Sequence, residues 1–202
     1  MTQGWLQVLR DWDRSLLLAI NSCNNSYLDG FFRIVTDKWV WFPFYGLLAW
    51  YFYKVQGKGF FRLILAAVLT VILTDQLASS VLKPWVHRLR PCHVPELAGQ
   101  LHLVDGACGG MFGFVSSHAA NTFGFFSLVF FGADRKWYWL TTLLFIWAFT
   151  VSFSRIYLAV HYPGDIIGGA LLGLLCGGLV AALSRKSPVF NYHIHLDKNN
   201  KA

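Results

Sequence analysis

Long apolar stretches separated by short polar segments recur along the chain from Trp39 to Leu183. A helix needs about 20 residues to cross the hydrocarbon core of a bilayer, which is about 30 Å thick. The pattern therefore predicts an all-α, multi-spanning transmembrane helix bundle with about five core spans, or six if the N-terminal region supplies another. We place the five spans at residues 39–55, 62–82, 117–132, 137–153 and 166–184.

The first 38 residues show a different pattern, in which apolar and charged side chains follow one another closely. This mixture is typical of amphipathic helices that lie at the membrane interface. The residues that follow the last apolar stretch are mainly polar. We therefore divide the chain into an interfacial amphipathic segment, a transmembrane domain and a cytoplasmic polar tail, at residues 1–38, 39–184 and 185–202.

The last predicted span contains Gly169, Gly173 and Gly177 at four-residue steps. Residues four apart share one face of a helix, so these glycines form a smooth stripe. Such a stripe predicts close packing against a neighbouring span.

Composition agrees with a membrane protein, because 55% of the residues are hydrophobic and 13% are charged. An ordinary soluble domain carries about 25% charged residues. The formal net charge of +7 could suggest a nucleic acid partner. However, the cations lie at the ends of apolar segments rather than along one polar face, so we expect no nucleic acid. The sequence does not set the oligomeric state.

The orientation of the bundle follows from the loops, since lysine and arginine near span ends accumulate on the cytoplasmic side. Three alternate connections carry such cations. They are Lys54, Lys58 and Arg62, then Arg135 and Lys136, then Arg185 and Lys186. The segments 83–116 and 154–165 must then lie together on the outer face. Both carry cations of their own, which asks for a functional reason.

Three clusters of chemically active residues fall on this outer face, each at a membrane boundary. They are Lys83 with Arg90, then Ser116, Ser117 and His118, then Arg155 with His161 and Asp165. Phosphoryl transfer requires cations and amides around the phosphate oxygens, an in-line nucleophile and an acid for the leaving group. The inventory fits this reaction. No carboxylate cluster of the kind that holds magnesium is present, so we expect no metal and no other cofactor.

The local sequence suggests how each cluster is built. Pro84 predicts that the second span ends at Lys83. If Pro84 opens a short new helix, Lys83 and Arg90 lie on nearly the same face. Ser116 precedes the third span, where its side chain can cap the helix while free backbone amides form an anion site.

The histidines differ in their neighbours. His118 lies in the first turn of the third span, where it can donate a proton to a departing oxygen. The four-residue step from His161 to Asp165 lets the carboxylate bind Nδ1 of the imidazole, which leaves Nε2 free to attack. Each cluster also has a structural interpretation, as a helix cap, an interfacial side chain or an ion pair. Their occurrence together on one face favours a shared site.

Three segments carry a family resemblance: Lys83 to Pro91 reads K-x6-R-P, Val115 to His118 reads V-S-S-H, and residues 154–165 read S-R-x5-H-x3-D. These look like the three signature motifs of the type 2 phosphatidic acid phosphatase family. The first and third match completely. The second differs from the family's P-S-G-H, because valine replaces the proline and serine replaces the glycine. The resemblance implies a membrane lipid phosphatase.

The resemblance also implies a role for each matching residue. His161 would attack phosphorus, Asp165 would orient it, and His118 would protonate the leaving group. The phosphate would be held by Lys83, Arg90, Ser116, Arg155 and the amide of Ser117. Water would then hydrolyse the phosphohistidine intermediate.

The implied partner is a phosphorylated lipid in the membrane. Undecaprenyl diphosphate is favoured, because bacterial family members of this size often act on it. Phosphatidylglycerophosphate, phosphatidic acid and lipid A are alternatives, as is a phosphotransferase that passes the group to another lipid. A non-enzymatic alternative is a channel or transporter that binds anionic headgroups. The expected location is the bacterial inner membrane, with the site facing the periplasm or the cell exterior.

Three further residues stand out. Asp75 lies inside the second span, and an ionisable residue at that depth is a functional candidate. We expect it to hydrogen-bond within the bundle and to help to position Lys83. Cys92 and Cys108 bracket the outer loop, and an oxidising compartment predicts a disulfide between them. Zinc bound by these cysteines and a nearby histidine is a weaker alternative, because no recognised zinc spacing is present.

Overall fold

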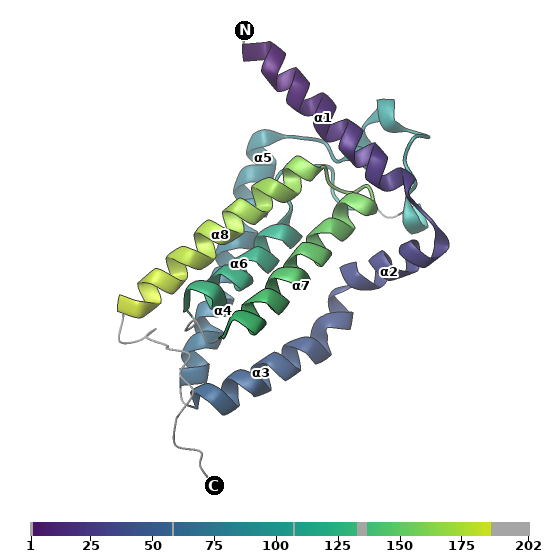
Figure 1. Ribbon diagram of the computed structural model, residues 1–202. Coiled ribbons are helices and arrows are strands. Elements are labelled where there is room, and N and C mark those ends of the chain that lie inside the picture. The colour runs from purple at the N-terminus through teal and green to yellow at the C-terminus, as the bar shows by residue number, and fades with distance from the viewer. Residues whose placement is uncertain (1, 58, 107, 133–136, 187–202) are drawn as a thin grey trace.

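The computed structural model describes residues 2–57, 59–106, 108–132 and 137–186. The regular structure of these residues is helical, so the predicted all-α class is confirmed (Figure 1). The α-helices are α1 (Thr2–Ser22), α2 (Ser26–Thr36), α3 (Phe42–Gln56), α4 (Gly59–Gln76), α5 (Lys83–Val86), α6 (Ser117–Gly132), α7 (Tyr138–Tyr157) and α8 (Pro163–Lys186). Shorter helical turns are η1 (Lys38–Trp41), η2 (Leu77–Leu82), η3 (Pro91–His93), η4 (Pro95–Leu97) and η5 (Val104–Gly106).

Three stretches of helix are long and apolar enough to cross a membrane: Gly59–Val86, Tyr138–Tyr157 and Pro163–Ser184. They correspond to the second, fourth and fifth predicted spans. The first and third predicted spans are occupied by α3 and α6, which have 15 and 16 residues in the described part of the chain. The cations Lys58, Arg135 and Lys136 used for the orientation, and the tail from residue 187, lie outside the described residues.

The centre of the bundle is α6, which packs against α4, α7 and α8. The glycine stripe of α8 faces α6 so closely that a Cβ atom at Gly173 would collide with the carbonyl of Ala120, and one at Gly177 with the carbonyl of Gly124. The predicted packing role of the stripe is therefore confirmed. This contact also fixes the outer ends of the two helices, since the amide of Ser116 donates to the carbonyl of Asp165 at 3.0 Å.

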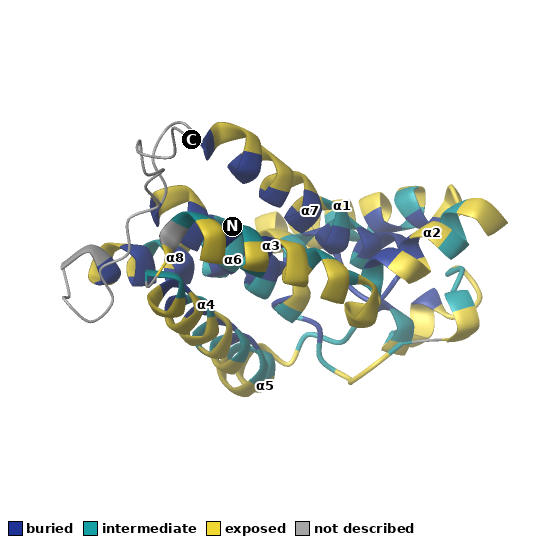
Figure 2. Ribbon diagram, turned by 90° about the horizontal axis from the view of Figure 1, so that it is seen from below, coloured by how far each residue is buried: buried dark blue, intermediate teal, exposed yellow. Residues whose placement is uncertain are grey.

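The outward faces of the long helices are apolar and exposed. Leu47 of α3, Phe61 of α4 and Leu175 of α8 have 64%, 68% and 72% of their surface exposed. In Figure 2, exposed residues likewise colour the outward faces of α4 and α7. A water-soluble protein rarely exposes so much contiguous apolar surface, whereas a lipid bilayer is the solvent that this surface requires.

The helix that contains Pro84 continues past the predicted end of the second span. The widened π-helical turn η2 leads directly into α5, and the helix ends at His87, which has a left-handed backbone with φ of 52°. A π-turn changes the hydrogen-bond register, which lets the helix accept a proline that has no N–H. Arg90 follows in an extended conformation, with φ of −66° and ψ of 152°. The prediction that Lys83 and Arg90 share one helix face was therefore wrong.

The N-terminal helix α1 crosses the outer end of the bundle (Figure 1). Its first half exposes apolar side chains such as Trp5 and Trp12, while Leu17 is buried against the bundle. Near its end, Asn21 donates to the carbonyl of Tyr157 at 2.7 Å and accepts from the amide of His102 at 2.8 Å. The second half of α1 is thus fixed to α7 and to the outer loop.

Candidate active site

A buried histidine and aspartate form the innermost part of the candidate site. Nδ1 of His161 lies 3.3 Å from Oδ2 of Asp165, and both residues are buried. His161 belongs to the short loop that joins α7 to α8, and Asp165 lies in the first turn of α8. Oδ2 also accepts from the amide of Tyr162 at 3.0 Å. A carboxylate on Nδ1 favours the tautomer whose lone pair is on Nε2.

Two residues that the sequence reasoning did not select complete this arrangement. The guanidinium of Arg88 donates to Oδ1 of Asp165 at 2.9 Å and to Oδ2 of Asp13 at 2.5 Å. It also lies over the ring of Tyr162, 4.1 Å from the centroid. Asp13 comes from α1 and accepts from the amide of Gly164 at 2.7 Å. A chain of charged contacts therefore runs from α1 through Arg88 to the His161–Asp165 pair.

Arg90 is held by the backbone of the outer loop. Its Nε donates to the carbonyl of Phe112 at 3.3 Å, and Nη1 donates to the carbonyl of Cys108 at 3.2 Å. Burial lowers the pKa of Arg90 from its ordinary value, and the Asp165 carboxylate acts in the opposite direction. The guanidinium of Arg90 is thus fixed in place next to the His161–Asp165 pair.

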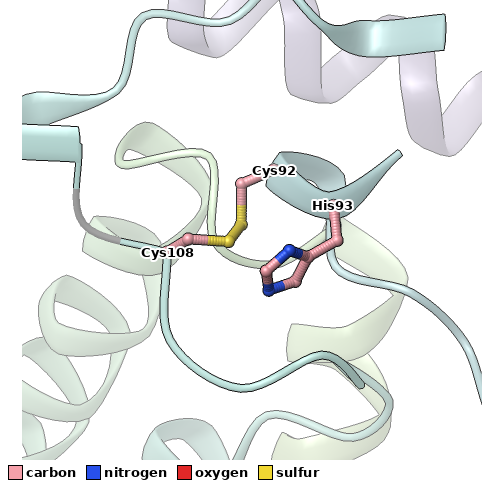
Figure 3. A group of neighbouring side chains, drawn as sticks. All are labelled: Cys92, His93 and Cys108. Atoms are coloured by element: carbon pink, nitrogen blue, oxygen red, sulfur yellow. A yellow bond between two sulfur atoms is a disulfide. The ribbon is translucent and has the colours of Figure 1, made fainter. Parts of the chain in front are cut away.

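The predicted disulfide between Cys92 and Cys108 is present, with the two Cα atoms 5.9 Å apart (Figure 3). It joins the turn that follows Arg90 to the loop segment in which the carbonyl of Cys108 accepts a hydrogen bond from Arg90. His93 lies beside it, and its Nε2 is 3.1 Å from the carbonyl of Gly109. The ligand atoms of Cys92, His93 and Cys108 lie within 4.8 Å of one another. Since the two sulfurs are bonded to each other, neither is the thiolate that zinc requires.

The remaining cations reach the same region from different helices. Lys83 donates to Oγ of Ser117 at 2.7 Å, and Arg155 donates to Oγ1 of Thr36. The positive charges of Arg90 and Arg155 both act against that of Lys83, and Arg90 also acts against Arg155, so the three cations repel one another. An anion bound between them would relieve this repulsion.

Two buried polar atoms in this region have no hydrogen-bond partner among the described residues: Oγ of Ser116 and Nε of Arg155. The sequence suggested that the side chain of Ser116 caps α6, but in the structure it does not. Buried donors without partners are rare in native proteins and require an explanation. A phosphate group between Ser116 and Arg155 would supply acceptors for both.

Thr36, the partner of Arg155, lines two cavities. The larger has a volume of about 410 Å³ and is lined by Thr36 and Arg155, with polar residues of the outer loop and α2. The smaller has a volume of about 260 Å³ and is lined by Thr36, Ser117 and His118. The imidazole of His118 also interacts electrostatically with Arg155, His161, Arg90 and Lys83. All eight residues selected from the sequence are thus brought to one end of the bundle.

His161 is uncharged at neutral pH. Burial lowers its pKa from the ordinary 6.5 to about 4, because the imidazolium loses its hydration, and the Asp165 carboxylate offsets only part of this effect. The lone pair on Nε2 is therefore available well below pH 7.

We expect this depressed pKa to appear in the pH dependence of stability. Between pH 6.5 and about 4 the unfolded chain binds a proton at His161 that the folded protein does not bind. The stability that the folded protein gains from keeping His161 neutral is therefore fully present above pH 6.5 and is lost as the pH falls toward 4. The Tm of the wild type in detergent should fall more between pH 7 and pH 5 than the Tm of His161→Gln. Equal decreases in Tm would contradict the assignment.

The family model described as the PAP2 superfamily matches residues 63–188. The chain belongs to the PAP2 superfamily. This PAP2 chain is 37% identical over 184 residues to a lipid A 4'-phosphatase of Bacteroides thetaiotaomicron, a match that covers 90% of this chain and 80% of the relative. It is 35% identical over 181 residues to a lipid A 4'-phosphatase of Porphyromonas gingivalis, and this match covers 87% of this chain and 74% of the relative.

Among solved structures, the PAP2 chain resembles LpxE of Aquifex aeolicus, with a TM-score of 0.59 and 26% identity. The similarity covers 83% of this chain and 93% of LpxE. The matched family region begins within α4, runs through α8 and contains all three motifs. The chain is therefore a membrane lipid phosphatase, an enzyme that hydrolyses phosphate esters, and the alternative of a channel or transporter is set aside.

Proposed function

We propose that this PAP2 enzyme hydrolyses a phosphate monoester of a lipid A-type glycolipid and releases the phosphate. The observation that carries the proposal is the similarity over most of the chain to two lipid A 4'-phosphatases. The family resemblance alone favoured undecaprenyl diphosphate. The relatives support the lipid A alternative better, because their matches extend beyond the motifs to 87% and 90% of this chain.

In the proposed reaction, Nε2 of His161 attacks phosphorus and the bond from phosphorus to the lipid oxygen breaks. The departing oxygen takes a proton from His118. The hydrogen-bonded Asp165 keeps the imidazole in the attacking tautomer and stabilises the positive charge that develops on it. The 3.3 Å contact between Nδ1 and Oδ2 supports this role.

The transferring phosphate is held by Lys83, Arg90, Ser116, Arg155 and the backbone amide of Ser117. The unpartnered Oγ of Ser116 and Nε of Arg155 support this assignment, since a bound phosphate gives each a hydrogen-bond acceptor. The three cations balance the charge that spreads over the equatorial oxygens in the transition state. Donors that are already fixed in place need no reorganisation during the reaction, which is the main source of electrostatic catalysis.

The second step is hydrolysis of the phosphohistidine. Water gives a proton to His118, its oxygen bonds to phosphorus, and the bond between phosphorus and Nε2 breaks. Free phosphate leaves, and both histidines return to their starting protonation states. A second lipid hydroxyl in place of water would make the enzyme a phosphotransferase.

A substrate panel tests the proposal. The detergent-solubilised protein is assayed with lipid A, undecaprenyl diphosphate, phosphatidic acid and phosphatidylglycerophosphate, and His161→Ala protein serves as the blank. The highest kcat/KM is expected for lipid A, with release of inorganic phosphate. A higher kcat/KM for another lipid would overturn the substrate assignment. Transfer of the phosphate to a lipid without its release would identify a phosphotransferase.

We further propose that the enzyme lies in the bacterial inner membrane with its site facing the periplasm. Two observations support this orientation. Disulfides persist in the periplasm and are rare in the cytosol, so the Cys92–Cys108 bond favours an outer location for the loop that carries it. Lys54 and Arg62 flank the junction of α3 and α4, at the opposite end of the bundle from the site (Figure 1). Residues 1–38 would then lie at the periplasmic interface.

Cysteine labelling in intact cells checks this orientation. Ala98 is exposed in the outer loop, and Cys23 is an exposed free cysteine. We expect Ala98→Cys, in a Cys23→Ser background that keeps the disulfide, to react with a membrane-impermeant maleimide in intact cells with a permeabilised outer membrane. A cysteine in place of Lys54 is the matched control and should react only after lysis. The reverse pattern would invert the proposed topology.

A further inference from the structure

Asp75 is a carboxylate inside a candidate membrane span that the proposed mechanism does not use. It lies in α4, eight positions before Lys83, within the apolar helix Gly59–Val86. It forms no hydrogen bond or ion pair with the other described residues, although its charge acts on Lys83. The expectation that Asp75 hydrogen-bonds within the bundle was therefore wrong. An ionisable group at this depth without a partner requires a functional reason.

The carboxylate lines the smaller cavity, of about 260 Å³, together with His118 and Asn121. The amide of Asn121 is held by Thr74, whose Oγ lies 2.6 Å from Oδ1 of the amide. The lining also includes aromatic and apolar residues: Trp41, Tyr45, Trp147 and Val151. The cavity thus has both a polar and an apolar lining.

The position of His118 identifies which part of the substrate enters this cavity. In the proposed function, His118 protonates the oxygen that leaves phosphorus, so the cavity next to His118 receives the alcohol part of the ester. The inference rests on that function. In the cavity, the occupant then meets the carboxylate of Asp75 and the amide of Asn121, together with the hydroxyl groups of Thr36, Ser117 and Thr122. It also meets aromatic rings.

Candidate lipids differ in what they offer to Asp75. An acylated amino sugar carries hydroxyl and amide N–H donors close to its phosphate ester, and acyl chains beyond them. Phosphatidic acid has two acyl esters and no donor at that position. A polyprenyl diphosphate would place its second phosphate there, where this anion and the carboxylate of Asp75 repel each other. Lys38 also lines the cavity, but it is exposed and its ammonium lies over the ring of Trp39.

We propose that Asp75 is a specificity-determining residue of this enzyme. It accepts a hydrogen bond from a hydroxyl or amide N–H of an acylated amino sugar, and its charge disfavours lipid diphosphates. A site that hydrogen-bonds a substrate group discriminates strongly against analogues without that group, because the polar atom of the protein is then left unpaired.

Asp75→Asn tests the proposal, because asparagine keeps the shape of the side chain and removes the charge. We expect kcat/KM for lipid A to fall by about 10-fold, because the hydrogen bond to a charged carboxylate becomes a weaker one to the neutral Oδ1 of asparagine. The value for phosphatidic acid should change by less than about 3-fold, because that lipid makes no bond to Asp75. The ratio of undecaprenyl diphosphate to lipid A hydrolysis should rise by about 10²-fold, since the repulsion is also removed. Gln76→Ala, on an exposed neighbouring residue, is the control and should leave all three values unchanged.

Two results with Asp75→Asn would overturn the inference. An equal loss with all three lipids would mean that Asp75 acts through Lys83 on the common phosphate site. Unchanged ratios, with the wild type active on lipid A, would remove Asp75 from the substrate contact while leaving the proposed function intact. A wild type that does not hydrolyse lipid A but hydrolyses another lipid would refute the proposed function instead, whatever the variant does.

Discussion

Replacement of His161 by alanine is expected to lower turnover by about 10⁴-fold or more, the scale for losing a nucleophile from a group of residues that act together. It should also abolish trapping of an acid-labile phosphoenzyme, because alanine supplies no nucleophile in place of the imidazole. Nδ1 faces Asp165, while Nε2 makes no hydrogen bond among the described residues. The measurement is a rapid quench of the purified protein with a lipid substrate labelled in its phosphate.

The control for this prediction is His87→Asn. His87 lies at the end of α5 with a left-handed backbone, a conformation that asparagine tolerates. The control should keep both turnover and the phosphoenzyme. His118→Ala should differ from both, with a loss of about 10²-fold on a lipid ester but a much smaller loss on an aryl phosphate, whose leaving oxygen needs little protonation. Near-normal turnover by His161→Ala would refute the phosphohistidine mechanism.

Arg88→Met is expected to lower turnover by about 10²-fold, the effect of a small misplacement of a reacting group. The variant leaves the carboxylates of Asp165 and Asp13 without the guanidinium that joins them. Removing one partner of a buried ion pair typically costs about 3 kcal/mol or more. The side chain of Arg88 is 25% exposed, so we expect a stability loss of about 2 kcal/mol after screening by solvent. Thermal unfolding in detergent measures it.

Arg14→Met is the matched control, because Arg14 is an arginine of the same region whose hydrogen bond within the described ranges goes to the carbonyl of Glu96, at 3.3 Å. Asp13→Asn should lower turnover less than Arg88→Met does, since Arg88 still holds Asp165. The double variant should lose less than the sum of the single variants, because the residues share one network. Additive losses, or an unchanged turnover in Arg88→Met, would separate this network from catalysis.

The contacts that sequence could predict are local ones. The pairing of His161 with Asp165 follows from a four-residue step across the start of a helix, and the glycine stripe of α8 follows from helical periodicity. The spans follow from runs of apolar residues long enough for a bilayer. Each of these signals lies within a short window of the chain.

The missed contacts are between distant segments. Asp13 lies 151 residues from Gly164, to which it is hydrogen-bonded, and it is surrounded in sequence by other charged residues of an amphipathic helix. Nothing in that pattern distinguishes it from a solvated side chain. Thr36, the partner of Arg155, is 119 residues away and equally inconspicuous. For Arg88 a signal did exist, since a carboxylate as buried as Asp165 requires a cation nearby.

On the proposed placement of residues 1–38 at the periplasmic interface, the attachment of α1 to Asp165 through Asp13 and Arg88 makes the catalytic centre sensitive to the lipid around it. Trp12 is exposed and directly precedes Asp13, so the tightness of headgroup packing at the surface acts on the helix that carries this carboxylate. Micelles and bilayers differ in curvature and in lateral pressure. The same protein should therefore have different rate constants in the two, even when substrate concentration per unit of surface is matched. Rate constants measured in detergent would then differ from those of the enzyme in its native membrane.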